Sequence, residues 1–88
     1  MFAYLNYKNK IHDKIEELKS DQGYYRECID NYVHVVKGFG GNVQKYEDIM
    51  FVYNQDGTVP DLVQGSIRRC EGVIQGLQLA IDALEKEL

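Results

Sequence analysis

The stretch that decides the fold is residues 61–88, DLVQGSIRRCEGVIQGLQLAIDALEKEL. Its apolar residues follow one another at alternating steps of four and three: Val63, Ile67, Cys70, Ile74, Leu77, Ile81, Leu84 and Leu88. This spacing is the heptad seam of a helix that packs against another helix. Thr58-Val59-Pro60-Asp61 just before it fits a capping arrangement, with the Thr58 hydroxyl near the first amides of the helix. We therefore predict a C-terminal helix over residues 58–88.

A second apolar stripe precedes this helix. Between Lys10 and Lys37 it recurs at steps of three, four or seven, at Ile11, Ile15, Leu18, Tyr25, Ile29, Tyr32 and Val36. The segment Gly38-Phe39-Gly40-Gly41 breaks or bends this helix. Val43, Tyr46, Met50 and Tyr53 resume the helical spacing, so the sequence predicts a kinked helix over residues 10–53. Asn54-Gln55-Asp56-Gly57 then marks a turn.

Taken together, the two stripes predict an all-α fold in a single helical domain, residues 1–88. It would begin with an N-terminal segment over about residues 1–9, followed by a kinked antiparallel helical hairpin. Small residues form a further stripe along the last helix: Gly65, Gly72, Gly76, Ala80 and Ala83. An 88-residue chain buries roughly 60–65% of its unfolded surface, so we expect this stripe to join copies of the chain into a homo-oligomeric bundle. Alternatively, the stripe packs on the chain's own first helix.

Composition excludes several classes of protein. A net charge of −4 argues against coating duplex nucleic acid, which requires clustered Lys and Arg. No apolar run reaches the roughly 18 residues of a membrane span, and two cysteines without close partners favour a reducing, cytoplasmic compartment. The sequence carries no catalytic motif, and His12 and His34 are far apart with no metal-ligand spacing, so we predict a protein that is not an enzyme and uses no cofactor or metal.

Aromatic residues suggest a binding role. Tyr4, Tyr7 and Lys8 lie together in the N-terminal segment. Tyrosine rings stack on nucleobases, and lysine neutralises phosphate, so this set is suited to reading a nucleotide. The alternative is a segment that only covers the end of the bundle, with buried rings and solvated hydroxyls.

Several short motifs match one known family. Tyr4 is followed by Leu18-Lys19 and then by Gly23, which comes one residue later than the usual glycine, and Val73–Leu79 holds a Gln75-Gly76 step with leucine where the family has phenylalanine. The chain in these respects resembles the anti-CBASS sponges, small tailed-phage proteins that sequester cyclic oligonucleotides.

The resemblance implies a short N-terminal helix, a kinked helical hairpin and assembly into a hexamer in the cytoplasm of an infected host cell. Cyclic dinucleotides would bind between subunits, with Tyr4 on a base and Lys19 on a phosphate, and cyclic trinucleotides would meet Arg68 or Arg69. The family's Gly-Tyr-Arg is Ala3-Tyr4-Leu5 here, so the role of that arginine is lost or moves to Lys8. Asp21 near Lys19 disfavours a phosphate there. The protein would act by stoichiometric capture of a host signal.

Two other functions remain open from the sequence. An acidic helical hairpin of this size also resembles WXG-type partner proteins of type VII secretion, which act by helix-on-helix docking, although the turn here lacks Trp-x-Gly. A third possibility is an adaptor whose apolar seam recruits a partner helix.

Overall fold

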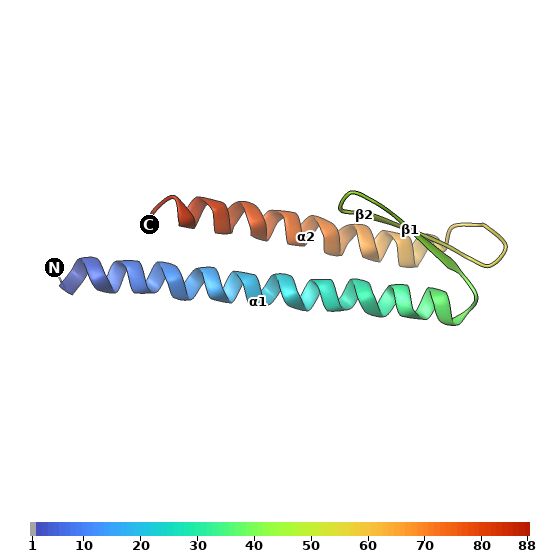
Figure 1. Ribbon diagram of the computed structural model, residues 1–88, viewed down its shortest axis with the longest axis horizontal. Coiled ribbons are helices and arrows are strands. Elements are labelled where there is room, and N and C mark those ends of the chain that lie inside the picture. Colours follow the sequence, from blue (N-terminus) through green and yellow to red (C-terminus); the bar gives the residue numbers. More distant parts are fainter. Residues whose placement is uncertain (1) are drawn as a thin grey trace.

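A computed structural model describes residues 2–88 as two antiparallel helices with a β-hairpin at their connected end (Figure 1). In chain order these are helix α1 (Phe2–Gly38), strand β1 (Asn42–Tyr46), strand β2 (Ile49–Tyr53) and helix α2 (Asp61–Glu85). The described chain is a rod of 63 × 18 × 17 Å. Both termini lie at the end opposite the hairpin, which we call the open end (Figure 1).

The all-α prediction is wrong, because residues 42–53 form a two-stranded antiparallel sheet and the fold is mixed α/β with 71% helix. β1 and β2 pair with Val43 opposite Val52 and Tyr46 opposite Ile49. Val43, Met50 and Val52 turn toward the helices and pack on the core. Residues 49–53 are an unbroken apolar run rich in β-branched and aromatic side chains, which favours a strand over the predicted helix.

A glycine cap ends α1 outright instead of bending it. Gly40 has a φ of +79°, and its amide donates to the Lys37 carbonyl at 3.0 Å. The Gly41 amide donates to the Val36 carbonyl at 2.9 Å, which completes a Schellman motif. α1 is also one unbroken helix from Phe2, so the separate N-terminal helix and the kinked helix over 10–53 are wrong as well.

The heptad seam of α2 is confirmed from Val63 to Leu84, and it packs on α1 in two clusters. The last predicted seam residue, Leu88, lies beyond the end of the helix and is 40% exposed. Toward the open end, the buried residues are Ile11, Ile15, Leu18 and Ile81. Toward the hairpin, the buried residues are Ile29, Val36, Val52 and Ile67, with Cys70 and Ile74 packed against them. The strands therefore complete the second cluster, because the helices alone would leave one side of it in water.

A buried polar side chain separates the two clusters. Gln22 is 3% exposed, and its Nε2 donates to the Ile74 carbonyl at 3.2 Å and to Gln78 Oε1 at 3.1 Å. Buried polar groups need such partners, because losing them costs about 1–3 kcal/mol. These bonds hold in only one register of α2 against α1.

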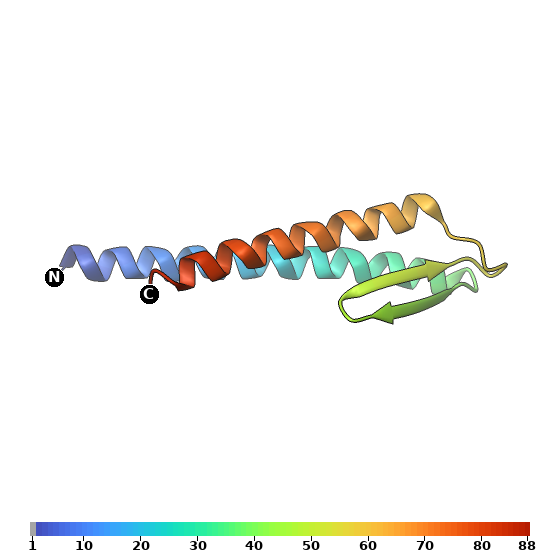
Figure 2. The same ribbon diagram turned by 90° about the horizontal axis from the view of Figure 1, so that it is seen from above.

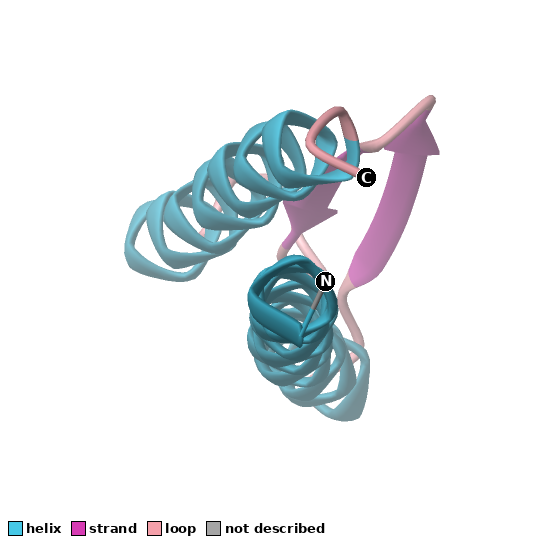
Figure 3. Ribbon diagram, turned by 90° about the vertical axis from the view of Figure 1, so that its left-hand side faces the viewer, coloured by secondary structure: helices cyan, strands magenta, loops and turns pink. Residues whose placement is uncertain are grey.

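The hairpin lies on one side of the helix pair (Figures 2 and 3). Polar side chains of α2 hold it there. Gln64 pairs with the outer edge of β2, accepting from the Val52 amide and donating to the Met50 carbonyl, both at 2.9 Å. Glu71 Oε2 accepts from the Met50 amide at 2.8 Å. The backbone amide and carbonyl groups on the free edge of β2 thus bond to side chains of α2 in place of a third strand.

The expected cap at the start of α2 is wrong. Pro60 is the N-cap residue and makes no side-chain cap bond. The Thr58 hydroxyl instead donates to Asp56 Oδ1 at 2.6 Å, within the turn. Together with the Thr58 amide, this bond holds the pKa of Asp56 below its ordinary value.

The stripe of small residues on α2 faces away from α1. A Cβ added at Gly65, Gly72 or Gly76 would meet nothing within 4 Å, so packing of the stripe on the chain's own first helix is wrong. In the region from Phe2 to Leu88, neither helix contains a stretch long and apolar enough to cross a membrane.

Replacing Gly41 with alanine is expected to destabilise the fold by about 1–3 kcal/mol through overpacking. A Cβ there would lie 2.6 Å from Val36 Cγ1 and 2.8 Å from the Val36 carbonyl oxygen, with the Tyr53 carbonyl oxygen nearer still. Gly38→Ala is the matched control, because its Cβ would meet nothing within 4 Å. Urea unfolding of both variants measures the difference, and equal loss of stability in the two would contradict this packing.

Candidate functional site

The six residues predicted to bind ligand fall into three separate places along the rod. Tyr4, Tyr7 and Lys8 lie on the first turns of α1 at the open end, and Lys19 lies farther along the same helix. Arg68 and Arg69 lie on α2 near the hairpin. One copy of the chain therefore does not bring the six together.

The open end joins the N-terminal aromatic residues to the C-terminus. Lys8 Nζ lies 4.8 Å from the centroid of the Tyr4 ring and donates to the Leu88 carbonyl oxygen at 3.2 Å. The Tyr7 hydroxyl donates to Glu87 Oε2 at 2.9 Å. The alternative of buried rings is wrong, since the Tyr4 side chain is 58% exposed. Tyr4 thus offers an open ring face beside a cation.

Lys19 is exposed, and its side chain makes no hydrogen bond or ion pair to any residue from Ala3 to Leu88. It lies 15 residues after Tyr4, which at a helical rise of about 1.5 Å per residue is roughly 22 Å along the axis. A small cyclic ligand cannot touch both side chains in one copy of the chain.

The two arginines differ in their availability to a ligand. Arg68 Nη1 pairs with Glu71 Oε1 at 2.7 Å, and its guanidinium carbon lies 4.4 Å from the centroid of Phe51. Arg68 therefore already supports the hairpin. Arg69 is exposed and donates only to the Ser66 hydroxyl, at 3.0 Å, among the described residues. Of the pair, Arg69 is the one that a phosphate could reach without breaking an ion pair.

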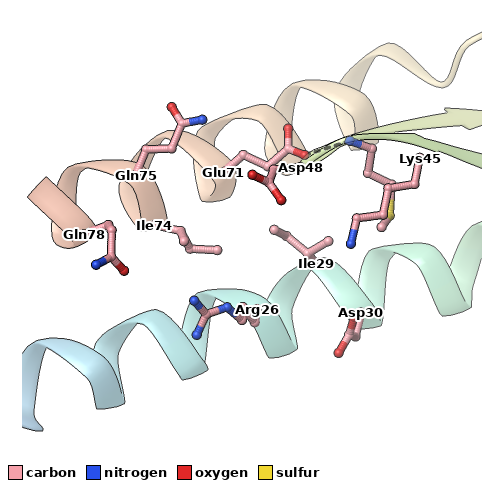
Figure 4. Close-up of a pocket in the computed structure, with 10 residues that line it drawn as sticks. Arg26, Ile29, Asp30, Lys45, Asp48, Glu71, Ile74, Gln75 and Gln78 are labelled. Atoms are coloured by element: carbon pink, nitrogen blue, oxygen red, sulfur yellow. Dashed lines mark hydrogen bonds between the residues drawn. The ribbon is translucent and has the colours of Figure 1, made fainter.

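A cleft of about 430 Å³ opens between the two helices and the tip of the hairpin (Figure 4). Its apolar walls come from Ile29, Met50 and Ile74. The polar residues that line it are Arg26 and Asp30 from α1, Lys45 and Asp48 from the hairpin, and Glu71, Gln75 and Gln78 from α2. This volume suits a small molecule, because ligand pockets commonly measure about 300–1,000 Å³.

The cleft has mixed charge. Arg26 and Lys45 make no ion pair with any residue from Ala3 onward, whereas Glu71 is held by the Met50 amide and Arg68. Asp30 and Asp48 line the same space, so a strongly anionic ligand would meet carboxylates as well as cations. The arrangement suits a polar molecule that carries both charges, or one with an amide or ring edge that the Gln75 side chain can bond. The Gln78 amide is already bonded to Gln22 and Asp82.

This cleft could not be predicted from the sequence, for a structural reason. Lys45 was predicted on a helix, and it reaches the cleft because the hairpin folds back beside the helix pair. The two glutamines at a spacing of three on α2, opposite Arg26 on α1, were a signal that could have pointed to it. Cys70 carries no signal of reactivity, since burial raises the pKa of its thiol.

Comparison with protein-family models, with curated proteins and with solved structures found no match to this chain. Over residues 2–88, no three His, Cys, Asp or Glu side chains come together as a metal site requires.

Glu87→Gln is expected to lower the pKa of Tyr7 toward its ordinary value of 10.0. The Glu87 carboxylate raises this pKa because it accepts a hydrogen bond from the phenol and repels the phenolate. A raised pKa in the folded state stabilises the protein below the unfolded pKa, and this contribution disappears as the pH rises through the folded pKa. The loss of this stabilisation therefore occurs above pH 10. Carbon NMR of the tyrosine rings measures it, with Glu85→Gln as the neighbouring control. An unchanged Tyr7 titration in Glu87→Gln would show that the hydrogen bond does not form.

Proposed function

We propose that this protein is a non-catalytic binding protein that captures cyclic di- and trinucleotides and so blocks CBASS signalling in an infected cell. The observation that carries the proposal is the exposed Tyr4 ring with the Lys8 ammonium 4.8 Å from its centroid. The resemblance in sequence to anti-CBASS sponges supports it. Capture alone, with no bond made or broken, lowers the free concentration of a signal in proportion to the sites present.

The geometry places one condition on this function. Tyr4 and Lys19 are roughly 22 Å apart along α1, so a ligand that touches both must lie between copies of the chain. Glu87 lies beside Tyr7, and its carboxylate weakens phosphate binding in a single copy. The Lys8 ammonium is already bonded to the Leu88 carbonyl oxygen. A homo-oligomer, of which the resemblance implies a hexamer, would add cations from a neighbouring copy to the open end.

Tyr4→Ala is expected to weaken binding of cyclic dinucleotides by about 5- to 150-fold, through loss of one stacked base. Lys19→Glu is expected to weaken it as well, through loss of a phosphate contact. Calorimetric titration with a panel of cyclic di- and trinucleotides measures both effects.

Tyr24→Ala is the matched control for Tyr4, since Tyr24 is a similarly exposed tyrosine (62%) on the same helix. Lys37→Glu is the control for Lys19. A folded wild-type protein that binds none of the nucleotides would end the proposal. If Tyr4→Ala binds the nucleotide with wild-type affinity and Arg26→Glu loses that binding, the nucleotide binds in the cleft and not at Tyr4.

A second candidate, a WXG-type partner or an adaptor acting by helix docking, is favoured by the outer face of α2. Leu62, Val73 and Leu79 are exposed there. At 100° per residue they lie on the same side as the stripe of small residues, which has open space above it. Small side chains let a second helix backbone approach closely, so this face suits a helix from another chain.

Leu79→Gln is expected to abolish such docking while leaving the melting temperature of the free protein unchanged, because Leu79 is 71% exposed. Leu5→Gln is the matched control, since Leu5 is 53% exposed at the far end of α1. Co-expression with the product of the adjacent gene, followed by purification and light scattering, measures complex formation. A complex that survives Leu79→Gln would show that the face of α2 is not used.

A further inference from the structure

The β-hairpin has two unlike sides. Cross-strand pairing places Lys45 with Met50 and Val43 with Val52 on the side that faces the helices. The alternation of side chains sends the intervening residues to the other side. We call this outer side the hairpin face and define it by Tyr46, Glu47, Ile49, Phe51 and Tyr53.

The hairpin face is hollowed and rich in aromatic residues. Its five residues line a shallow depression of about 510 Å³. The Tyr46 side chain is 60% exposed, and its ring meets the Phe51 ring edge-on at a centroid distance of 5.6 Å. Water-facing residues of a two-stranded sheet are usually polar, so an exposed ring beside two half-buried rings indicates a binding surface.

This aromatic cluster already contacts one cation from its own chain. The guanidinium of Arg68 lies 4.4 Å from the Phe51 centroid, within the roughly 6 Å of a cation–π contact. Arg68 comes from α2, behind the hairpin, and its partner Glu71 keeps it there at 2.7 Å. The exposed Tyr46 ring has no such cation among the described residues.

The charge around the hairpin face favours a positive ligand over a negative one. Glu47 lines the depression, and its carboxylate makes no ion pair among the described residues. Arg68 reaches this face at Phe51, but its charge is paired with Glu71. Lys45 and Asp48 line the cleft on the opposite, helix-facing side. A phosphate would therefore meet the Glu47 carboxylate on this face, whereas a cation would meet both that carboxylate and the Tyr46 ring.

We propose that the hairpin face binds an arginine or lysine side chain carried by a basic segment of a partner protein. The cation would lie over the exposed Tyr46 ring with the Glu47 carboxylate beside it. This contact involves neither the open end nor the cleft, so it is independent of nucleotide capture.

The test uses the full-length isotope-labelled protein and the peptide acetyl-Gly-Arg-Gly-Arg-Gly-amide, followed by NMR. Shift changes are expected at Tyr46, Glu47 and Phe51, and they should weaken as salt is raised. The same peptide with glutamine for both arginines should produce none. Tyr46→Ala is expected to weaken binding by about 2- to 5-fold, as for an exposed cation–π contact, and Glu47→Gln should also weaken it.

Tyr24→Ala, which removes an equally exposed ring from α1, should leave peptide binding unchanged. Tyr46→Phe keeps the ring and should bind like wild type, which separates loss of the ring from disturbance of the hairpin. The proposal fails if the arginine peptide leaves the hairpin face unshifted, or if the glutamine peptide shifts it equally. It also fails if a cyclic dinucleotide shifts these residues and the arginine peptide does not.

Discussion

The close approach of Gly41 to the end of α1 is the contact on which the rest of the structure depends. The Gly41 amide closes the helix onto the Val36 carbonyl, and its missing side chain leaves room for the Val36 side chain and the end of β2. Because the chain turns within these few residues, the hairpin that follows lies beside the helix pair. That placement lets Val52 enter the core and lets Gln64 and Glu71 satisfy the outer edge of β2.

The helical part of the fold could be predicted from the sequence, and the hairpin could not. The heptad spacing from Val63 onward is sustained over many turns, so it admits one interpretation, and the structure packs it as expected. Residues 43–53 are too short for that, because a short apolar run such as residues 49–53 fits either a helix or a buried strand. What decides between them is the glycine cap at Gly40 and the tertiary packing of Val52, and neither can be read from spacing.

The candidate sites show the same division. The exposure of Tyr4 beside Lys8 follows from their spacing of four on one helix face. The cleft depends on residues from three elements, including Lys45, whose position follows from the hairpin. The pairing of Arg68 with Glu71 and Phe51 also depends on the hairpin, and it turns a predicted ligand residue into a structural one. Surface chemistry on one helix was therefore predictable, whereas chemistry that joins elements was not.

The buried Gln22 also bears on how the rod moves. It divides the core into a hairpin half, where strands and helices enclose Val52 and Ile67, and an open half, where two helices share one narrow apolar seam. Regions with fewer buried contacts open more readily, in units that follow such boundaries. The open half can therefore separate and re-form while the hairpin half stays folded. Amide hydrogens before Gln22 would then exchange with solvent sooner than those near Ile67, and the molecule would behave as a rigid head with a dynamic two-helix tail.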